Sequence, residues 1–308
     1  YWFEPSYQFG ILVNNTRTSR RTKNDTKYWS WRNILTYNKT FGKHAVNGML
    51  GKEMSESKWE HLMASTTGFL TNTTPDLSAG DASKFGGEGN SDSSAIASFF
   101  GRAFYSFDDR YLLTATLRRD GTSKFAKDNR WGWFPSAALA WKVSNESFME
   151  PISDVLNNLK FRLGWGTTGN QNVSNWAHMA LLSSKTTPWG AGVLTGNTAN
   201  PDLKWETTYS TNIGLDFNLF QNRIESIADV YYKKTKDLLL QLPLPAYLGS
   251  YGPGAAANPG SNIGELQNSG IELTLNNVNI YRIGFHWSSN LVFSMNRNKV
   301  TRMDSESY

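Results

Sequence analysis

Segments in which apolar and polar side chains alternate with a period of two residues recur along the whole chain. Within 111–117, the odd-numbered residues are all apolar: Tyr111, Leu113, Ala115 and Leu117. Two of the three even-numbered residues are threonines: Leu112, Thr114 and Thr116. We call each such set of alternate residues a parity. Successive side chains of a strand point to opposite faces, so this pattern predicts two-faced β-strands. No apolar run of about 18 residues exists, which excludes a transmembrane helix. The sequence therefore predicts an all-β fold.

The length of the alternating segments separates two kinds of β-protein. We count about eleven strand candidates near the ~10 residues that a tilted membrane-spanning strand needs, whereas a soluble sandwich uses ~5 or 6 residues per strand. Trp131 and Trp141 lie on the same parity of one candidate. At a tilt of about 40° their separation projects to roughly 26 Å, close to the ~25 Å apolar band between the aromatic girdles of transmembrane barrels. These observations favour a transmembrane antiparallel β-barrel.

Short and long connections alternate between the predicted strands. The short ones are predicted at 42–43, 108–109, 221–222 and around 277–279, and the long ones at 55–93, 119–130, 168–206 and 235–268. Outer-membrane barrels have short periplasmic turns and long extracellular loops. We therefore expect the four long connections to lie on the extracellular side of the membrane.

The composition argues against several classes of function. The chain has no cysteine, which removes disulfides and thiol nucleophiles, and its four histidines show no metal-binding spacing. The net charge is +5, but the basic residues are scattered, and the densest group, Arg17, Arg20, Arg21 and Lys23, is expected in a loop. A continuous basic stripe would mark a nucleic-acid site. We expect no catalytic set, no cofactor, no metal and no nucleic-acid partner, and hence no enzyme.

Two groups of residues are candidates for contact with a transported molecule. The first lies on the charged parity of the strands and is expected to face a water-filled lumen: Arg102, Thr114, Thr116, Arg118, Arg162, Asp216, Glu225, Asp229, Arg282 and Asn290. The second consists of aromatic residues expected in long extracellular loops, where they could contact a ligand or a lipoprotein: Trp59, Trp176, Trp189 and Tyr247. Exposed aromatic rings stack on sugars and peptides, but they also pack loops together.

Six ordered blocks carry a family resemblance that covers essentially the whole chain. They are LTYNKTFGKHAVNGMLGKE (35–53), FFGRAFYSFDDRYLLTATLRRDGTSKF (99–125), WGWFPSAALAWKVSNESFM (131–149), LKFRLGWGTTGNQ (159–171), NPDLKWETT (200–208) and NIGELQNSGIELTL (262–275). In this order they resemble the C-terminal barrel region of SusC/RagA-type TonB-dependent outer-membrane transporters of the Bacteroidetes.

The resemblance implies a 22-stranded barrel with an N-terminal plug, a SusD-like surface lipoprotein over its mouth and energy coupling through TonB. Residues 1–308 would then form roughly half of such a barrel, without the plug domain, the TonB box or the final strands. The block at 118–125 maps the family pattern R-x-D-G-T-S-x-F onto this chain. We expect its Asp120-Gly121 step to mark where a strand leaves the membrane for an extracellular loop.

The predicted function is TonB-dependent import of oligosaccharides or peptides across a Gram-negative outer membrane. The alternative is a passive porin or an adhesion-type barrel without TonB coupling. A β-rich extracellular binding or enzyme domain is a third reading, which predicts a protein soluble without detergent. The residues do not discriminate between glycan and peptide.

Overall fold

The computed structural model describes residues 2–243, 245, 247 and 256–303. Most of these residues lie in strands: β1 Trp2–Glu4, β2 Tyr7–Phe9, β3 Leu12–Asn14, β4 Thr18–Phe41, β5 His44–Thr67, β6 Gly86–Phe107, β7 Tyr111–Thr122, β8 Trp131–Lys142, β9 Leu156–Asn170, β10 Leu182–Thr187, β11 Gly190–Thr195, β12 Glu206–Leu219, β13 Ile224–Lys236, β14 Leu239–Gln241, β15 Gly260–Asn262, β16 Glu265–Arg282 and β17 Phe285–Arg302. Short 3-10 helices are η1 Leu77–Ala79, η2 Ala82–Lys84, η3 Val143–Asn145 and η4 Ser147–Ile152. No helix among the described residues is long and apolar enough to cross a membrane.

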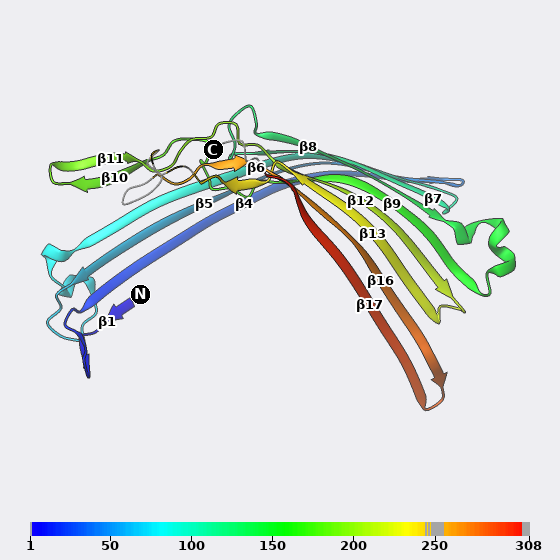
Figure 1. The fold of residues 1–308 in the computed structure, drawn as a ribbon, viewed down its shortest axis with the longest axis horizontal. Helices are drawn as coiled ribbons and strands as arrows, with labels where there is room; N and C mark the ends of the chain where they lie inside the picture. Colours follow the sequence, from blue (N-terminus) through cyan, green and yellow to red (C-terminus); the bar gives the residue numbers. More distant parts are fainter. Residues whose placement is uncertain (1, 244, 246, 248–255, 304–308) are drawn as a thin grey trace. The chain divides into compact units, whose positions relative to one another are not determined.

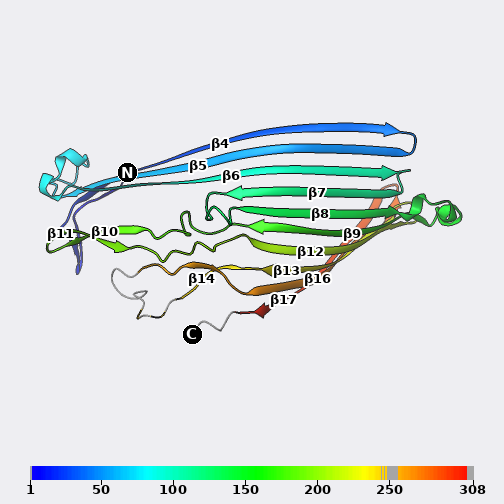
Figure 2. The ribbon, with the colours of Figure 1, turned by 90° about the horizontal axis from the view of Figure 1, so that it is seen from above.

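Eleven strands form one sheet in the order β1-β4-β5-β6-β7-β8-β9-β12-β13-β16-β17, which Figures 1 and 2 show as a series of neighbouring ribbons. The neighbours from β6 to β17 pair in antiparallel fashion. In the described part of the chain β17 has β16 as its one neighbour in the sheet, so the sheet is not closed there. Three further strand pairs, β2-β3, β10-β11 and β14-β15, form separate two-stranded sheets, and β14-β15 continues the register of β13-β16.

The chain divides into two compact units. The smaller covers Tyr1–Ser30 and Ser55–Ala95, and the larger covers Trp31–Met54 and Ile96–Tyr308. In the smaller unit, Arg17 donates hydrogen bonds to Asn72 Oδ1 (2.7 Å) and to the Phe69 carbonyl (2.9 Å). Buried Ser19 donates to the Pro75 carbonyl at 2.7 Å. These side chains tie the 68–85 connection to the start of β4.

The long outer parts of β4, β5 and β6 correct the expected loop at 55–93. The connection occupies only 68–85, because β5 continues to Thr67 and β6 begins at Gly86. The basic residues Arg20, Arg21 and Lys23 also lie in strand β4, not in a loop. In the parts of β4, β5 and β6 next to the 68–85 connection, both faces of the sheet carry polar side chains, as expected for strands that have no apolar environment on either side. Alternation is therefore lost there although the backbone remains extended.

The tight turns confirm three of the four predicted short connections. The β4-β5 turn occupies 42–43, the β6-β7 turn 108–110 and the β12-β13 turn 220–223. Asp108 and Asp109 have φ of 53° and 51°, as the two central residues of a type I′ turn require, and Arg110 N donates to the Phe107 carbonyl at 2.9 Å.

The fourth predicted turn, at 277–279, is wrong. Asn277 and Asn279 lie inside β16, and the chain reverses at Ile283-Gly284, where Gly284 has a φ of 82°. A β-bulge falls between Val278 and Ile280.

Candidate functional site

One face of the larger unit carries a continuous row of apolar side chains. Directly paired residues of antiparallel strands lie on the same face of a sheet. The register connects one such row across eight strands: Tyr105, Leu113, Leu139, Leu163, Ile213, Val230, Ile271 and Met295. Leu139 is 52% exposed and Met295 58% exposed. A water-soluble protein rarely leaves so large an apolar surface uncovered, so this face is built to meet lipid.

Aromatic side chains border this apolar face at both ends of the strands. At the short-turn end, Tyr111 stacks on Phe107 and on Trp141, with ring centroids 6.5 Å and 6.3 Å apart. At the long-loop end, Phe99 and Trp131 have centroids 6.1 Å apart. Such paired girdles are typical of the two membrane interfaces of a barrel.

The opposite face brings together most of the residues predicted to line a lumen. The register places nine of the ten on this one polar face: Arg102, Thr114, Thr116, Arg118, Arg162, Asp216, Glu225, Asp229 and Asn290. Thr116, for example, pairs with Arg102 on one side and with Ser136 on the other. Glu225 and Asn290 also line one polar hollow of about 280 Å³. We call this surface the polar face.

Arg282 does not belong to the polar face, and its prediction is wrong. The bulge between Val278 and Ile280 changes the parity of the last residues of β16, so that Arg282 pairs with Phe285 and lies on the apolar side. The apolar alternation of Tyr281, Ile283, Phe285 and Trp287 runs through the turn at Ile283-Gly284, so it belongs to the ends of two strands.

An ion cluster spans three strands in the middle of the polar face. Arg162 of β9 donates to both carboxylate oxygens of Asp216 on β12, at 2.6–3.1 Å, and to Asp229 Oδ2 on β13 at 3.1 Å. Gly214 leaves room for it, because a Cβ there would lie 2.5 Å from both Arg162 Cζ and Asp229 Oδ1. The two carboxylates neutralise the charge of Arg162, and the cluster connects strands β9, β12 and β13 through their side chains. One net negative charge remains on it.

A second network lies where β7 approaches the long-loop end. Arg118 donates to Asp120 Oδ2 and to Ser98 Oγ, each at 2.8 Å. Its guanidinium also lies 5.3 Å from the centroid of the Phe100 ring. Strand β7 ends at Thr122, so Asp120 and Gly121 are among its last three residues, next to the loop that begins at 123.

Sequence reasoning missed a small core at the long-loop end. Phe125, Phe134, Leu203 and Trp205 form a buried cluster in which Phe125 and Leu203 are fully inaccessible. Trp205 packs edge-on against Phe125 and Phe134, with centroids 5.7 Å and 5.3 Å apart. It also donates from Nε1 to the Arg130 carbonyl at 3.0 Å. Phe134 falls on the polar parity of β8, and that apolar exception is the signal that could have revealed the cluster.

The predicted loop aromatics occupy different elements. Trp59 lies in strand β5, where it stacks on His61 at 5.6 Å, so its placement in a loop is wrong. Trp176 lies in the β9-β10 connection, and Trp189 forms the tip of the β10-β11 hairpin with 93% of its surface exposed. Tyr247 is 85% exposed in the β14-β15 connection. Their role as ligand contacts stays a prediction.

At the short-turn end, the Glu146 carboxylate joins three side chains. Tyr111 Oη donates to it at 2.7 Å, Trp141 Nε1 at 3.0 Å and Arg110 Nη1 at 3.0 Å. Hydrogen bonds from Tyr111 and Trp141, together with the charge of Arg110, hold the pKa of the Glu146 carboxyl below its usual range. Glu146 lies between η3 and η4, outside the strands. It fixes two rings of the aromatic girdle.

We expect this contact to make stability depend on acid. A carboxyl group whose pKa is lower in the folded protein than in the unfolded chain stabilises the fold at pH values above its unfolded pKa, about 4.3 for Glu. This contribution to stability is lost as the pH falls through the folded-state pKa. Glu146→Gln should therefore lower the unfolding temperature at pH 7 and flatten its dependence between about pH 5 and pH 3. Thermal unfolding in detergent across this range tests the expectation. Parallel profiles for both proteins would contradict it.

No group of three or more His, Asp or Glu side chains capable of holding a metal ion occurs among the residues that the structure describes. The polar face thus offers charged and hydrogen-bonding groups along a wall, arranged to contact solutes or water. Its residues come from strands far apart in sequence.

Comparison with known proteins identifies the family of this chain. Residues 2–307 match the family described as TonB dependent receptor-like, beta-barrel. The chain belongs to this family. As a TonB-dependent receptor β-barrel, it lies in the outer membrane, and the soluble extracellular domain is excluded. Its open eleven-stranded sheet is half the strand number that the SusC/RagA resemblance implies.

Curated relatives and solved structures agree with this assignment. The chain is 37% identical to TonB-dependent receptor P3 of Formosa agariphila, over 88% of this chain and 27% of that receptor. It is 39% identical to TonB-dependent receptor SusC of Bacteroides thetaiotaomicron, over 69% of this chain and 22% of SusC. It resembles the RagAB peptide importer in its closed-closed state with a TM-score of 0.84 and 28% identity, covering 94% of this chain and 31% of the other. The chain therefore spans less than a third of the length of these relatives.

Proposed function

We propose that this chain forms part of the barrel wall of a TonB-dependent importer of oligosaccharides or peptides. The observation that carries the proposal is the two-faced sheet: an apolar row across eight strands on one side and a charged wall on the other. A barrel of this kind separates lipid from a water-filled passage. Likeness to SusC and to the RagAB peptide importer supports active import.

The proposal includes the parts that the resemblance implies outside this chain. We propose a plug domain and TonB box elsewhere in the same receptor, further strands that close the barrel, and a SusD-like lipoprotein at the extracellular mouth. Trp176, Trp189 and Tyr247 are candidate contacts for that lipoprotein or for the ligand. The wall residues of the polar face would line the route of the substrate once the plug moves.

Uptake measurements test the proposal directly. Cells that express the receptor should accumulate a labelled oligosaccharide or oligopeptide from its growth medium, and deletion of tonB or collapse of the proton gradient should abolish this. A strain without the receptor is the control. Uptake that survives both treatments would contradict active import and favour a passive porin instead. Absence of uptake with retained cell attachment would favour an adhesion barrel.

A further inference from the structure

Two cations of the apolar face, on strands β5 and β7, are each flanked by aromatic rings. Lys52 of β5 and Arg119 of β7 make no ion pair with any residue that the structure describes. By contrast, Lys234 pairs with the Glu265 carboxylate at 2.7 Å. The Nε of Arg119 is also buried and has no hydrogen-bond partner within the described chain. Arg119 as a whole is only partly buried, so an anionic ligand would pair with the accessible part of its guanidinium.

Aromatic rings hold both cations in place. The Arg119 guanidinium lies over Trp131 and Trp133, at 4.7 Å and 5.1 Å from the ring centroids. The Lys52 ammonium lies 5.5 Å from the centroids of both Trp31 and Phe99, and Phe99 is the strand partner of Arg119. Only β6 separates β5 from β7 in the sheet, a spacing of about 10 Å between the two strands. Two positive charges are thus presented side by side at the long-loop edge of the apolar band.

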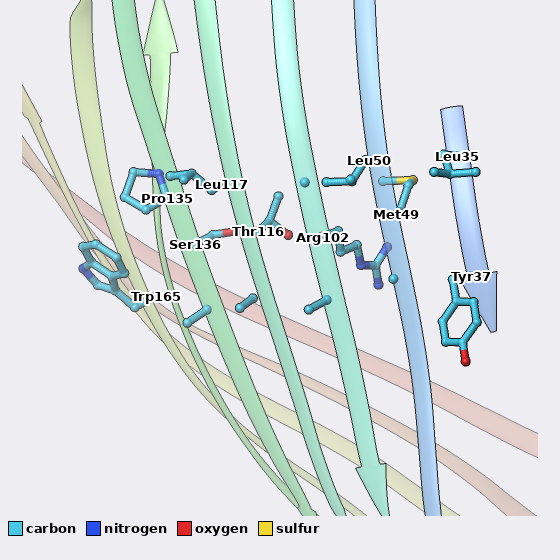
Figure 3. A pocket seen from close by; sticks show the side chains of 15 residues that line it. Leu35, Tyr37, Met49, Leu50, Arg102, Thr116, Leu117, Pro135, Ser136 and Trp165 are labelled. Carbon is cyan, nitrogen blue, oxygen red and sulfur yellow. The ribbon is translucent and has the colours of Figure 1, made fainter. Parts of the chain in front are cut away.

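An apolar groove leads from these cations toward the middle of the band. The hollow beside Lys52 and Arg119 has a volume of about 830 Å³, and a neighbouring hollow of about 600 Å³ shares Leu35, Leu50, Gly101 and Leu117 with it. Figure 3 shows side chains of the second hollow, among them Leu50 of β5, Leu117 of β7 and Trp165 of β9. Small residues form its floor: Gly48, Gly101, Ala103, Ala115 and Ala137.

The length of the groove fits a lipid chain. Ala115 lies four positions before Arg119 along β7, which corresponds to about 13 Å. One leaflet contributes about 15 Å, half of the ~30 Å hydrocarbon thickness. Long loops face the exterior in such barrels, which places the cations in the outer leaflet.

We propose that Lys52 and Arg119 bind the phosphate of an acylated outer-leaflet glycolipid, with one acyl chain in the adjacent groove. The charge complementarity selects an anionic headgroup, and the small floor residues admit the chain. The proposal is independent of what the receptor imports. It assigns a structural lipid to one patch of the lipid-facing wall.

Native mass spectrometry of the purified full-length receptor with diphosphorylated lipid A tests the site. The double variant Lys52→Gln/Arg119→Gln should weaken binding roughly thirty-fold, since each of the two lost charge contacts is worth about 1 kcal/mol and about 1.4 kcal/mol is ten-fold. Lys236→Gln is the matched control, because Lys236 also stacks on an aromatic ring, Tyr209 at 5.5 Å, but does not line the groove. Lys52→Arg/Arg119→Lys should retain binding.

Two further measurements keep the result decisive. Ala115→Phe should fill the groove floor and weaken lipid A binding while leaving both cations in place. Dephosphorylated lipid A should bind the parent protein as weakly as phosphorylated lipid A binds the double variant. Heat-modifiable gel mobility checks that each variant is folded. Equal binding by the folded double variant and the parent would overturn the proposal. So would a receptor dimer that the same substitutions dissociate, because the patch would then be a subunit interface.

Discussion

Leu139→Arg is expected to destabilise the folded barrel by about 1–3 kcal/mol, because the substitution places a charge on the lipid side between the bilayer midplane and the short-turn girdle. Leu139 lies in the apolar row between Leu113 and Leu163, two residues before Trp141 of the girdle, and half of its surface is exposed on that face. Urea unfolding in phospholipid vesicles measures the change in free energy. Loss of heat-modifiable mobility in cell envelopes reports failed assembly.

Ala138→Arg is the matched control for this prediction. Ala138 is the next residue of β8, lies on the polar face and pairs with Gly164, whose missing side chain leaves space beside it. The same arginine should therefore be tolerated there within about 1 kcal/mol, as at an exposed site away from packed features. If both variants lost equal stability, the two faces would not differ in solvent, and the facing assignment would be wrong.

Hydrogen bonds to charged groups contribute about 1.5–3 kcal/mol, and solvent screens part of this because Arg162 is partly exposed, so Arg162→Ala should cost about 1–2 kcal/mol. The substitution leaves the carboxylates of Asp216 and Asp229 adjacent on neighbouring strands without their shared cation. Combining Arg162→Met with Asp216→Asn and Asp229→Asn should recover part of the loss, because no unpaired charge then remains. Urea unfolding of the single and triple variants measures both effects.

Lys160→Ala is the control for charge removal alone. Lys160 lies on the same strand and the same face as Arg162 but forms no ion pair within the described residues. Its loss should change the free energy of unfolding by less than about 0.5 kcal/mol. A loss as large as that of Arg162→Ala would show that net charge, and not the three-strand cluster, stabilises the wall.

Alternation predicted the sheet well wherever one face meets an apolar environment. A one-residue slip would move every apolar side chain of β7 or β8 to the other face, so the pattern specifies both the strand and its register there. The tight turns at 42–43 and 108–109 were predictable for the same reason, because small or polar residues interrupt the pattern between two strands. Nine of the ten lumen candidates share a face because parity survives from strand to strand.

The wrong predictions, the turn at 277–279, the facing of Arg282 and the loop at 55–67, arise where the alternation of side chains does not indicate which face of the sheet a residue occupies. Tyr281, Ile283, Phe285 and Trp287 continue an apolar alternation straight through the turn at 283–284, while Asn277 and Asn279 resemble turn residues although they pair within a bulged strand. A bulge inserts one residue and reverses the facing of all that follow, which is why Arg282 was misplaced. Beyond the apolar band, as in 55–67, both faces are polar and only the pairing of neighbouring strands reveals the strand.

The core at the long-loop end depends on contacts that no local pattern predicts. Phe125 and Leu203 are distant in sequence, and Trp205 joins them to Phe134 of the sheet. Gly169 is needed for this approach, because a Cβ there would lie 2.2 Å from the Phe134 ring. These residues anchor two long connections to the barrel wall, so the loops near the mouth begin from a fixed base.

Solvent accessibility of spin labels along β7 tests the central claim that this sheet separates lipid from water. The chain contains no cysteine, so single cysteines can be placed at 113, 115 and 117 and at 114 and 116 of the receptor in a cysteine-free background. In vesicles, labels at the three odd positions should be relaxed mainly by oxygen, which concentrates in lipid. Labels at the two even positions should be relaxed mainly by a water-soluble nickel chelate. Equal nickel accessibility at both sets, or alternation of the opposite sense, would contradict the account.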